Sequence, residues 1–438
     1  KAFPSWSSTP GPERGRVLLR AANIVRERAE EIARMMTREE GKTIQESRGE
    51  VLKGLALLEY YAGEGYRMGG RTTPAEARDV FSFTLRKPLG VVALISPFNF
   101  PWANPMWKLC PALVTGNTVL LKPSELTPMT ASLIVEIFHD AGLPPGVLNL
   151  LIGLGKDVGD AIVEAPQIKA ISFTGSNAIG TAINVKAAAL GKKVSCEMGG
   201  KNAVVVLDDA DLDKATQAII GGAFGSTGQR CTATSRIVAT ASVKEELLAR
   251  LIEKANQLKI GNGLDESVDM GPAVSDSQLK KDLSYVEVAK QDGAKLVCGG
   301  KQPKNLGNGY YIEPTIFDNV LPNMRIFQEE VFGPVLSIVT AKSMDEAFAF
   351  ANQVPFGLST AIFSQDINSI MHYINKAETG MVHINEPTIG GEAQLPFGGV
   401  KATSIGDREM SDEGLNFFSH TKTVFLNYSN SAERSMMR

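Results

Sequence analysis

The stretch VVALISPFNFPW, residues 91–102, decides the fold class of this chain. Its first five residues form a buried strand, and a proline-rich loop follows at once. The same order of strand, loop and helix recurs as far as Leu190, with further strands expected at 118–121, 147–151 and 170–173. Such alternation is typical of a parallel sheet with helices on both faces. We therefore predict an α/β protein whose loops after the strands meet along one edge of the sheet, where ligands bind.

Outside this stretch, the chain contains a second α/β run and two isolated strands. The second run begins at Asn202 with AVVVL and continues with an expected helix at 212–224. The isolated strands are VFSFTLR at 80–86 and TVFLN at 423–427. These two can pair with each other in an arm, or with strands across a subunit boundary.

The composition is that of an ordinary globular protein of several domains. The 438 residues are 43% hydrophobic and 21% charged, and the net charge is −3. This near-neutral balance argues against a partner that is a nucleic acid or an anionic membrane. Four cysteines are too few for a disulfide framework, and the four histidines lack metal-ligand spacing, so we expect no metal and a cytoplasmic location. The chain opens on Lys1 rather than Met, so this end does not settle targeting.

Polar or glycine-containing segments follow three of the expected strands. Asn99 lies between two prolines, where its amide can donate a hydrogen bond to a developing oxyanion, or can cap a simple turn. Lys122 and Glu125 can reach the hydroxyls of one ribose, or form a surface turn. Gly175 and Ser176 lead into a helix, whose free N–H groups and dipole can face a phosphate. Each signal is weak alone, and the GxGxxG fingerprint is absent.

A fourth segment is a pair of motifs, CEMGGK with Glu197 and TGQRCTA with Cys231. Cys231 lies in a loop of small residues, where backbone N–H groups and the neighbouring Arg230 can stabilise a thiolate. A buried structural cysteine is the ordinary alternative, and we assign Cys110, Cys196 and Cys298 to it.

Taken together, in this order and spacing, the four segments resemble those of the aldehyde dehydrogenase family. The segments EEVFGP at 329–334 and PFGGVK at 396–401 fit the same resemblance, which extends over essentially the whole chain. In that family a cysteine thiolate attacks an aldehyde, hydride passes to a nicotinamide, and water hydrolyses the thioester. The resemblance implies that Cys231 is the nucleophile and Glu197 the general base. It also implies that Asn99 holds the oxyanion and that Glu409 relays protons.

The resemblance further implies a nicotinamide site, with NAD preferred over NADP because the charge of Glu125 repels a 2′-phosphate. The residues expected to bind the cofactor are Ile95, Ser96, Pro97, Phe98, Lys122, Ser124, Glu125, Gly155, Gly159, Phe173, Gly175, Ser176, Ile179, Met198, Gly199, Glu330 and Phe332.

By the same resemblance, the chain has a Rossmann-like cofactor domain, an α/β catalytic domain and a small β arm. We expect the cofactor domain at 1–69 and 89–199, the catalytic domain at 200–415, and the arm at 70–88 and 416–429. Such arms join subunits, so we expect a homodimer or homotetramer.

Three other functions share this scaffold or this chemistry. The first is a CoA-acylating dehydrogenase, which typically lacks a base at Glu197. The second is a catalytically silent scaffold protein, which the presence of Cys231 and Asn99 disfavours. The third is an acyl-phosphate reductase, whose motifs differ from these segments.

The expected substrate is a small aldehyde that carries a carboxylate at its far end. Segments 98–108 and 228–236 look most like those of semialdehyde dehydrogenases, and of these the 2-oxoglutarate semialdehyde branch is the most similar. The expected substrate residues are Phe100, Asn104, Trp107, Arg230, Thr232 and Thr388. Arg230 can receive the carboxylate, or can face away from the tunnel and support its own loop.

Overall fold

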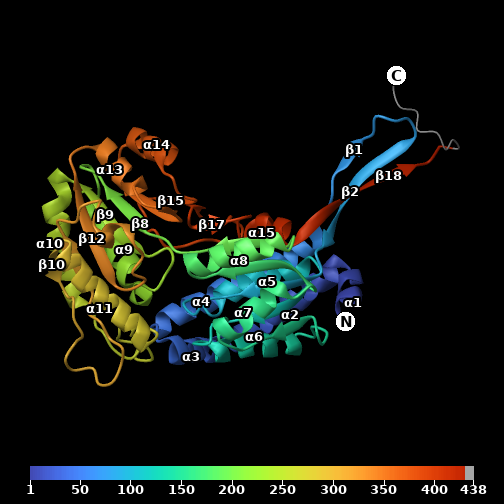
Figure 1. Cartoon of the computed structure of the whole chain (residues 1–438), viewed down its shortest axis with the longest axis horizontal. Helices are drawn as coiled ribbons and strands as arrows, with labels where there is room; N and C mark the ends of the chain where they lie inside the picture. Colours follow the sequence, from blue (N-terminus) through green and yellow to red (C-terminus); the bar gives the residue numbers. More distant parts are fainter. Residues whose placement is uncertain (430–438) are drawn as a thin grey trace.

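The computed structural model describes residues 1–429, which build two largely parallel sheets and a projecting arm (Figure 1). The first sheet has six strands in the order β17-β7-β6-β3-β4-β5. Their bounds are Val91–Ile95 for β3, Thr118–Lys122 for β4, Leu148–Leu150 for β5, Ile168–Thr174 for β6, Lys193–Glu197 for β7 and Ser404–Ile405 for β17. All pair in parallel except β17, which runs antiparallel to β7.

Helices cover this sheet on both faces. They are α1 (Phe3–Ser8), α2 (Gly11–Glu27), α3 (Ala29–Glu40), α4 (Ile44–Arg67), α5 (Ala103–Val114), α6 (Pro128–Asp140), α7 (Gly155–Glu164), α8 (Asn177–Ala189) and α15 (Ser411–Phe417). Gly41, at a φ of 98°, ends α3, because the left-handed conformation there favours glycine. Thr43 and Glu46 then form a capping box that starts α4.

The second sheet has seven strands in the order β10-β11-β12-β9-β8-β14-β15. They are β8 (Asn202–Val206), β9 (Thr234–Thr240), β10 (Lys295–Cys298), β11 (Thr315–Asp318), β12 (Val335–Ala341), β14 (Ser359–Phe363) and β15 (Met381–Ile384). The covering helices are α9 (Leu212–Phe224), α10 (Ala241–Gln257), α11 (Asp276–Gln291), α12 (Arg325–Gln328), α13 (Met344–Asn352) and α14 (Ile367–Lys376). The short pieces are the 3-10 turn η1 (Gly225–Gly228) and the pair β13 (Phe356–Gly357) and β16 (Val400–Lys401). Every residue of β8 is buried, as its unbroken apolar run predicts for a strand covered on both faces.

The arm consists of β1 (Thr72–Pro74), β2 (Val80–Pro88) and β18 (Ser419–Asn427). The prediction that the two isolated strands pair with each other is confirmed, with Thr84 opposite Thr423. Figure 1 shows this antiparallel sheet reaching away from the rest of the molecule. Its apolar side chains Phe81, Phe425 and Leu426 are exposed. Pairing of the arm with another subunit stays a prediction.

The strands and helices expected from the sequence are confirmed, with ends that shift by a few residues. Several short strands were not expected, and β17 is one of them. β17 lies inside the range 200–415, yet it joins the edge of the six-stranded sheet. The proposed domain limits therefore stay predictions. Among the helices of residues 1–429, none is both long and apolar enough to cross a membrane.

Candidate functional site

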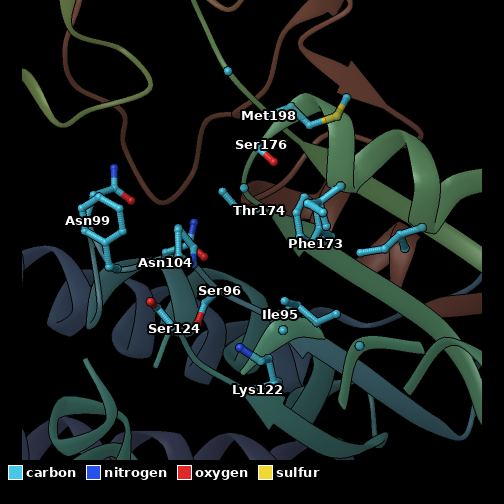
Figure 2. A pocket seen from close by; sticks show the side chains of 18 of the residues that line it. Ile95, Ser96, Asn99, Asn104, Lys122, Ser124, Phe173, Thr174, Ser176 and Met198 are labelled. Atoms are coloured by element: carbon cyan, nitrogen blue, oxygen red, sulfur yellow. The ribbon is translucent and has the colours of Figure 1, made fainter. Parts of the chain in front are cut away.

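A cavity of about 730 Å³ opens at the carboxyl ends of β3, β4 and β6 (Figure 2). Every residue that the sequence predicted to bind the cofactor lines it. So do five of the expected catalytic and substrate residues, namely Asn99, Phe100, Asn104, Trp107 and Cys231. The loops that follow the parallel strands therefore meet at one place, together with the loop that carries the cysteine.

The end of β4 presents a lysine and a glutamate to this cavity. Lys122 is buried, and its Nζ donates a hydrogen bond to the Pro123 carbonyl at 2.9 Å. The same Nζ lies 3.5 Å from Oε2 of Glu125, whose side chain is largely exposed. Both residues line the cavity, so a donor and an acceptor lie together at the end of β4, as recognition of two hydroxyls on one ribose requires.

The N-terminus of α8 forms a second wall. Its N-cap residue, Ser176, makes no side-chain capping bond in the described part of the chain, so the first N–H groups of the helix are open to a ligand. A Cβ atom at Gly175 would lie 2.5 Å from the Phe173 ring, so only glycine fits this turn. Two hydroxyls lining the cavity, those of Ser96 and Thr174, are buried and have no hydrogen-bond partner within residues 1–429. Such groups fit a phosphate-bearing dinucleotide.

Glu330 and Phe332 close the cavity from the side of the seven-stranded sheet. Glu330 Oε1 accepts a hydrogen bond from the Gly200 N–H at 2.8 Å. Burial raises the pKa of Glu330. Phe332 has a φ of 65°, which is rare for a large residue, and its ring lies 5.9 Å from that of Phe98. Backbone strain of this kind often marks a functional site.

Cys231 follows η1 in a loop with unusual backbone geometry. Ser226 and Thr227 both have positive φ, at 48° and 57°, and both are buried. The Cys231 carbonyl accepts a hydrogen bond from Asn202 Nδ2 at 2.8 Å, and this bond holds the backbone of Cys231 in place. Burial raises the pKa of the Cys231 thiol to about 12, and the charges of Glu330 and Glu197 add to the effect. The thiol is therefore neutral at pH 7 and needs a base before it can attack.

Glu197, at the end of β7, is buried but does not line the cavity. Its Oε2 accepts a hydrogen bond from the Ser404 hydroxyl at 2.5 Å, while Oε1 has no partner among the described residues. Burial raises the pKa of Glu197 well above its usual range, and the nearby charge of Glu409 raises it further. A Cβ atom at Gly398 would lie 2.5 Å from Oε1, which explains the glycine of PFGG there.

Glu409 also lies behind the cavity rather than on its lining. Its Oε1 accepts hydrogen bonds from Lys108 Nζ and from the Ser172 hydroxyl. Its Oε2 is buried without a partner within residues 1–429. The structure thus brings Glu197, Glu409 and Lys108 into one buried polar cluster beneath the six-stranded sheet's ligand edge.

The substrate end of the cavity is formed by α5 and the loop before it. The rings of Trp107 and Phe397 stack with centroids 5.2 Å apart. Trp107 Nε1 and Asn104 Oδ1 are both buried, and neither finds a hydrogen-bond partner among residues 1–429. Figure 2 shows Asn99 and Asn104 facing Phe173 and Ser176 across the space. This end therefore offers aromatic walls with two unused polar groups.

Three expected substrate residues lie outside the lining of the cavity. Arg230 donates from Nη2 to Glu46 Oε1 at 3.2 Å and from Nε to the Ser226 hydroxyl at 3.0 Å. Thr388 donates to the Thr232 carbonyl at 2.7 Å, so these two residues brace the loop that carries Cys231. The alternative in which Arg230 supports its own loop matches these contacts.

Several cavity residues escaped the sequence analysis. They are Lys156, Asp160, Val163, Thr174, Ala182, Ile183, Lys186, Gln278 and Lys281. Most lie on helices, where sequence alone does not show which polar face meets a ligand. Gln278 Nε2 also donates to the Phe332 carbonyl at 3.1 Å and so holds the strained loop.

The aldehyde dehydrogenase family model matches residues 1–424. An α-ketoglutaric semialdehyde dehydrogenase of Bacillus subtilis is 47% identical over 428 residues, which are 97% of this chain and 88% of that protein. A 2,5-dioxopentanoate dehydrogenase of Saccharolobus solfataricus is 44% identical, again over 97% of this chain and 88% of that protein. A crystal structure of betaine aldehyde dehydrogenase from Staphylococcus aureus in complex with NAD⁺ superposes with a TM-score of 0.96 at 36% identity, covering 100% of this chain and 87% of that one.

Proposed function

Since the chain belongs to the aldehyde dehydrogenase family and is therefore an aldehyde-oxidising enzyme, we propose that it oxidises an ω-carboxylated semialdehyde with NAD, using Cys231 as nucleophile. The observation that supports this most is the single cavity that joins Cys231 and Asn99 to the residues expected to bind the nucleotide.

In the proposed mechanism the Cys231 thiol gives up its proton to solvent water, and the sulfur bonds to the aldehyde carbon. The carbonyl oxygen becomes an oxyanion, which accepts hydrogen bonds from the Asn99 amide and the Cys231 N–H. NAD, when bound, supplies the acceptor for the hydride that leaves this carbon, so that a thioester on Cys231 results. Glu197 then takes a proton from water, the resulting hydroxide adds to the thioester carbon, and the thiolate leaves as the acid is released.

This role requires Glu197 to turn from Ser404 toward the cavity. Its buried position and raised pKa suit a base that works near neutral pH. The partnerless Oε1 leaves one oxygen of the carboxyl group uncommitted within the described residues. The CoA-acylating alternative has no observation in its favour, because a base is present at this position.

We assign the cofactor preference to Glu125 and Lys122. The Glu125 carboxylate accepts hydrogen bonds from ribose hydroxyls and repels a 2′-phosphate, whereas Lys122 attracts one. The relative from Staphylococcus aureus has been solved with NAD⁺, which supports NAD as the cofactor of this chain.

The substrate class rests on the relatives that act on semialdehydes and on the polar groups at the α5 end of the cavity. Arg230 is engaged by Glu46, so a substrate carboxylate has to compete for it. Trp107 lines the cavity, and its buried indole N–H has no partner among residues 1–429, so we assign it as a second donor.

The test is a panel in which 2,5-dioxopentanoate, succinate semialdehyde and malonate semialdehyde are compared with an uncharged aldehyde of matched length. Wild type, Arg230→Met and Trp107→Phe are scored by kcat/KM. The proposal expects the wild type to favour an acid by at least about tenfold. It expects Trp107→Phe, which keeps the ring and removes the N–H, to reduce that advantage. No advantage for any acid in the wild type contradicts the proposed substrate class.

The arm and the exposed apolar residues on it support a homo-oligomer. We propose a homodimer or homotetramer in the cytoplasm, which light scattering of the purified protein and fractionation of the source cells would test.

A further inference from the structure

The loop between α3 and α4, with the first two turns of α4, touches both sides of the reaction centre. We call residues 40–50 the α3–α4 bracket. We infer that this bracket positions Asn99 and the Cys231 loop relative to each other, through Lys42, Glu50 and Glu46. The inference rests on the proposed roles of Asn99 and Cys231, and it assigns positioning residues that contact neither substrate nor cofactor.

One arm of the bracket holds the loop that carries Asn99. Lys42 Nζ donates to the Asn99 carbonyl at 2.6 Å and to Glu50 Oε2 at 2.7 Å. The other carboxylate oxygen of Glu50 accepts hydrogen bonds from the N–H groups of Trp102 and Ala103, both at 2.9 Å. Lys42 and Glu50 are almost completely buried. Together they fix the backbone at Asn99 and just beyond it, and so set the direction of the Asn99 amide.

A second arm holds the loop that carries Cys231. Glu46 Oε1 accepts hydrogen bonds from the Ser226 N–H and from Arg230 Nη2. Ser226 is one of the two residues with positive φ just before the nucleophile. Such a conformation needs support from its surroundings, and the carboxylate of Glu46 supplies it. Glu46 Oε2 is at the same time part of the capping box with Thr43, so the nucleophile loop is tied to the start of α4.

Close backbone contacts pack the bracket against residues 263–271. The Ile44 N–H donates to the Gly263 carbonyl at 2.7 Å. A Cβ atom at Gly271 would lie 2.0 Å from the Gly41 carbonyl oxygen, so the backbone at Gly271 packs directly against the backbone at Gly41. Thr227, in the nucleophile loop, donates to the Gly271 carbonyl at 3.0 Å. The bracket and the nucleophile loop therefore rest on the same segment.

Phe100 joins the two arms from the cavity side. Lys42 Nζ lies 4.5 Å from the centroid of its ring, and the Arg230 guanidinium carbon lies 6.0 Å from it. Phe100 lines the cavity, so a shift of either cation moves a wall of the substrate site.

A purely stabilising role predicts a different outcome from a positioning role. Removing one partner of a buried ion pair lowers stability, because the other charge is left buried and unpaired, and it does so wherever in the fold the pair lies. The geometry of the oxyanion site, in contrast, is sensitive, because a misplacement of about 1 Å can cost about 100-fold in rate. We therefore expect variants of the bracket to lose acylation rate as well as stability, whereas breaking a buried pair elsewhere in the fold lowers stability alone.

The experiment compares Lys42→Met with Lys42→Arg and with a matched control, Lys244→Met. Lys244 on α10 is also largely buried and pairs with Asp318 on β11 at 2.8 Å, away from the cavity. The readouts are the rate of the first NADH turnover by rapid mixing, the Kd for NAD, and the melting temperature.

We expect Lys42→Met to slow the first turnover about 100-fold, with the Kd for NAD changed by less than about twofold. Lys42→Arg should recover part of the rate, and Lys244→Met should lower the melting temperature without slowing the first turnover. If Lys42→Met does not fold, Glu46→Gln is the second variant, with an expected slowing of about tenfold.

First-turnover rates in Lys42→Met and Glu46→Gln equal to that of the wild type would overturn the inference, as would an equal loss in Lys244→Met. Failure of the proposed function is a separate outcome, since it appears in the wild type as the absence of any NADH burst that depends on Cys231.

Discussion

The two parallel sheets each carry a cavity at the carboxyl ends of their strands, and the two cavities differ in whether the buried polar atoms of their lining residues have partners within residues 1–429. The cavity of the six-stranded sheet contains Ser96, Asn104, Trp107 and Thr174, whose buried polar atoms have no partner within residues 1–429. The cavity of the seven-stranded sheet, of about 480 Å³, is also lined by polar residues, among them Asp209.

Asp209, which lines the second cavity, finds its hydrogen-bond partners in the loop before α14. Asp209 Oδ2 accepts hydrogen bonds from the Ser364 hydroxyl and from the N–H groups of Gln365 and Asp366, at 2.8–3.0 Å. Of the buried side-chain atoms without a partner in residues 1–429, none belongs to a residue lining that cavity. The same topology therefore builds a ligand site in one sheet and a set of helix caps in the other. The difference lies in whether the polar groups are left unsatisfied.

The largest expected difference between the two cavities is in the rate of aldehyde oxidation. It should appear when the Cys231 sulfur is removed at the first cavity and the Ser242 hydroxyl is removed at the second. Cys231→Ala should reduce aldehyde oxidation by at least about 10⁴-fold, because no covalent intermediate can form. Its affinity for NAD should stay close to that of the wild type. The matched change Ser242→Ala, at the second cavity, should leave the rate unchanged. Steady-state assays and NAD titration test this, and comparable losses in both variants contradict the assignment.

Changing Glu197, which is assigned to deacylation and not to the activation of Cys231, should affect only the second half of the reaction. Glu197→Gln keeps the shape of the side chain but takes no proton from water, so deacylation should slow by about 10²- to 10³-fold. Rapid mixing should then show a burst of NADH followed by a slow steady state. If the burst and the steady rate fall by the same factor, Glu197 has another role.

The pH dependence should reflect the raised pKa values of Cys231 and Glu197. Both groups must be deprotonated to act, and burial favours their neutral forms. The rate should therefore rise as pH increases from 6 to 9, by up to about tenfold per pH unit for each proton that must be lost. Glu197→Gln should flatten the part of the profile that reports deacylation. A wild-type rate that falls over this range is incompatible with the assignment.

Cofactor choice should respond to a smaller change at the end of β4. Glu125→Gln removes the charge that repels a 2′-phosphate, so the preference for NAD over NADP should weaken by about fivefold. The wild type should favour NAD in kcat/KM. A wild type that favours NADP by more than about tenfold would refute the role of Glu125.

The smallest effect is expected in the second cavity. Asp209→Ala removes acceptors for the loop before α14 and should lower the melting temperature by about 1 to 3 °C. The rate of aldehyde oxidation should not change. A loss of activity in this variant, at unchanged melting temperature, would mean that the second cavity also takes part in function.

Strand-end loops were predictable because parallel strands bring their carboxyl ends together. That is why Ser96, Lys122 and Gly175 were expected in one cavity and line it. β17 was not predictable, because two residues carry no periodicity and its pairing depends on an edge that exists only after folding.

The orientation of single side chains was also beyond the sequence. Glu197 turns to Ser404, which is 207 residues away, and Arg230 turns to Glu46, which is 184 residues away. Gln278 and Lys281 reach the cavity from a helix of the other sheet, with no local motif to indicate it. Packing of distant elements decides these contacts, so spacing along the chain does not reveal them.

The central claim is that an acyl group passes through Cys231. The most direct measurement is intact-protein mass spectrometry of Glu197→Gln after rapid quenching with aldehyde and NAD. The account predicts a mass increase of one acyl group, located on the peptide that contains Cys231 and absent from the double variant with Cys231→Ala. An unmodified protein after NADH has formed, or an acyl group on another residue, would contradict it.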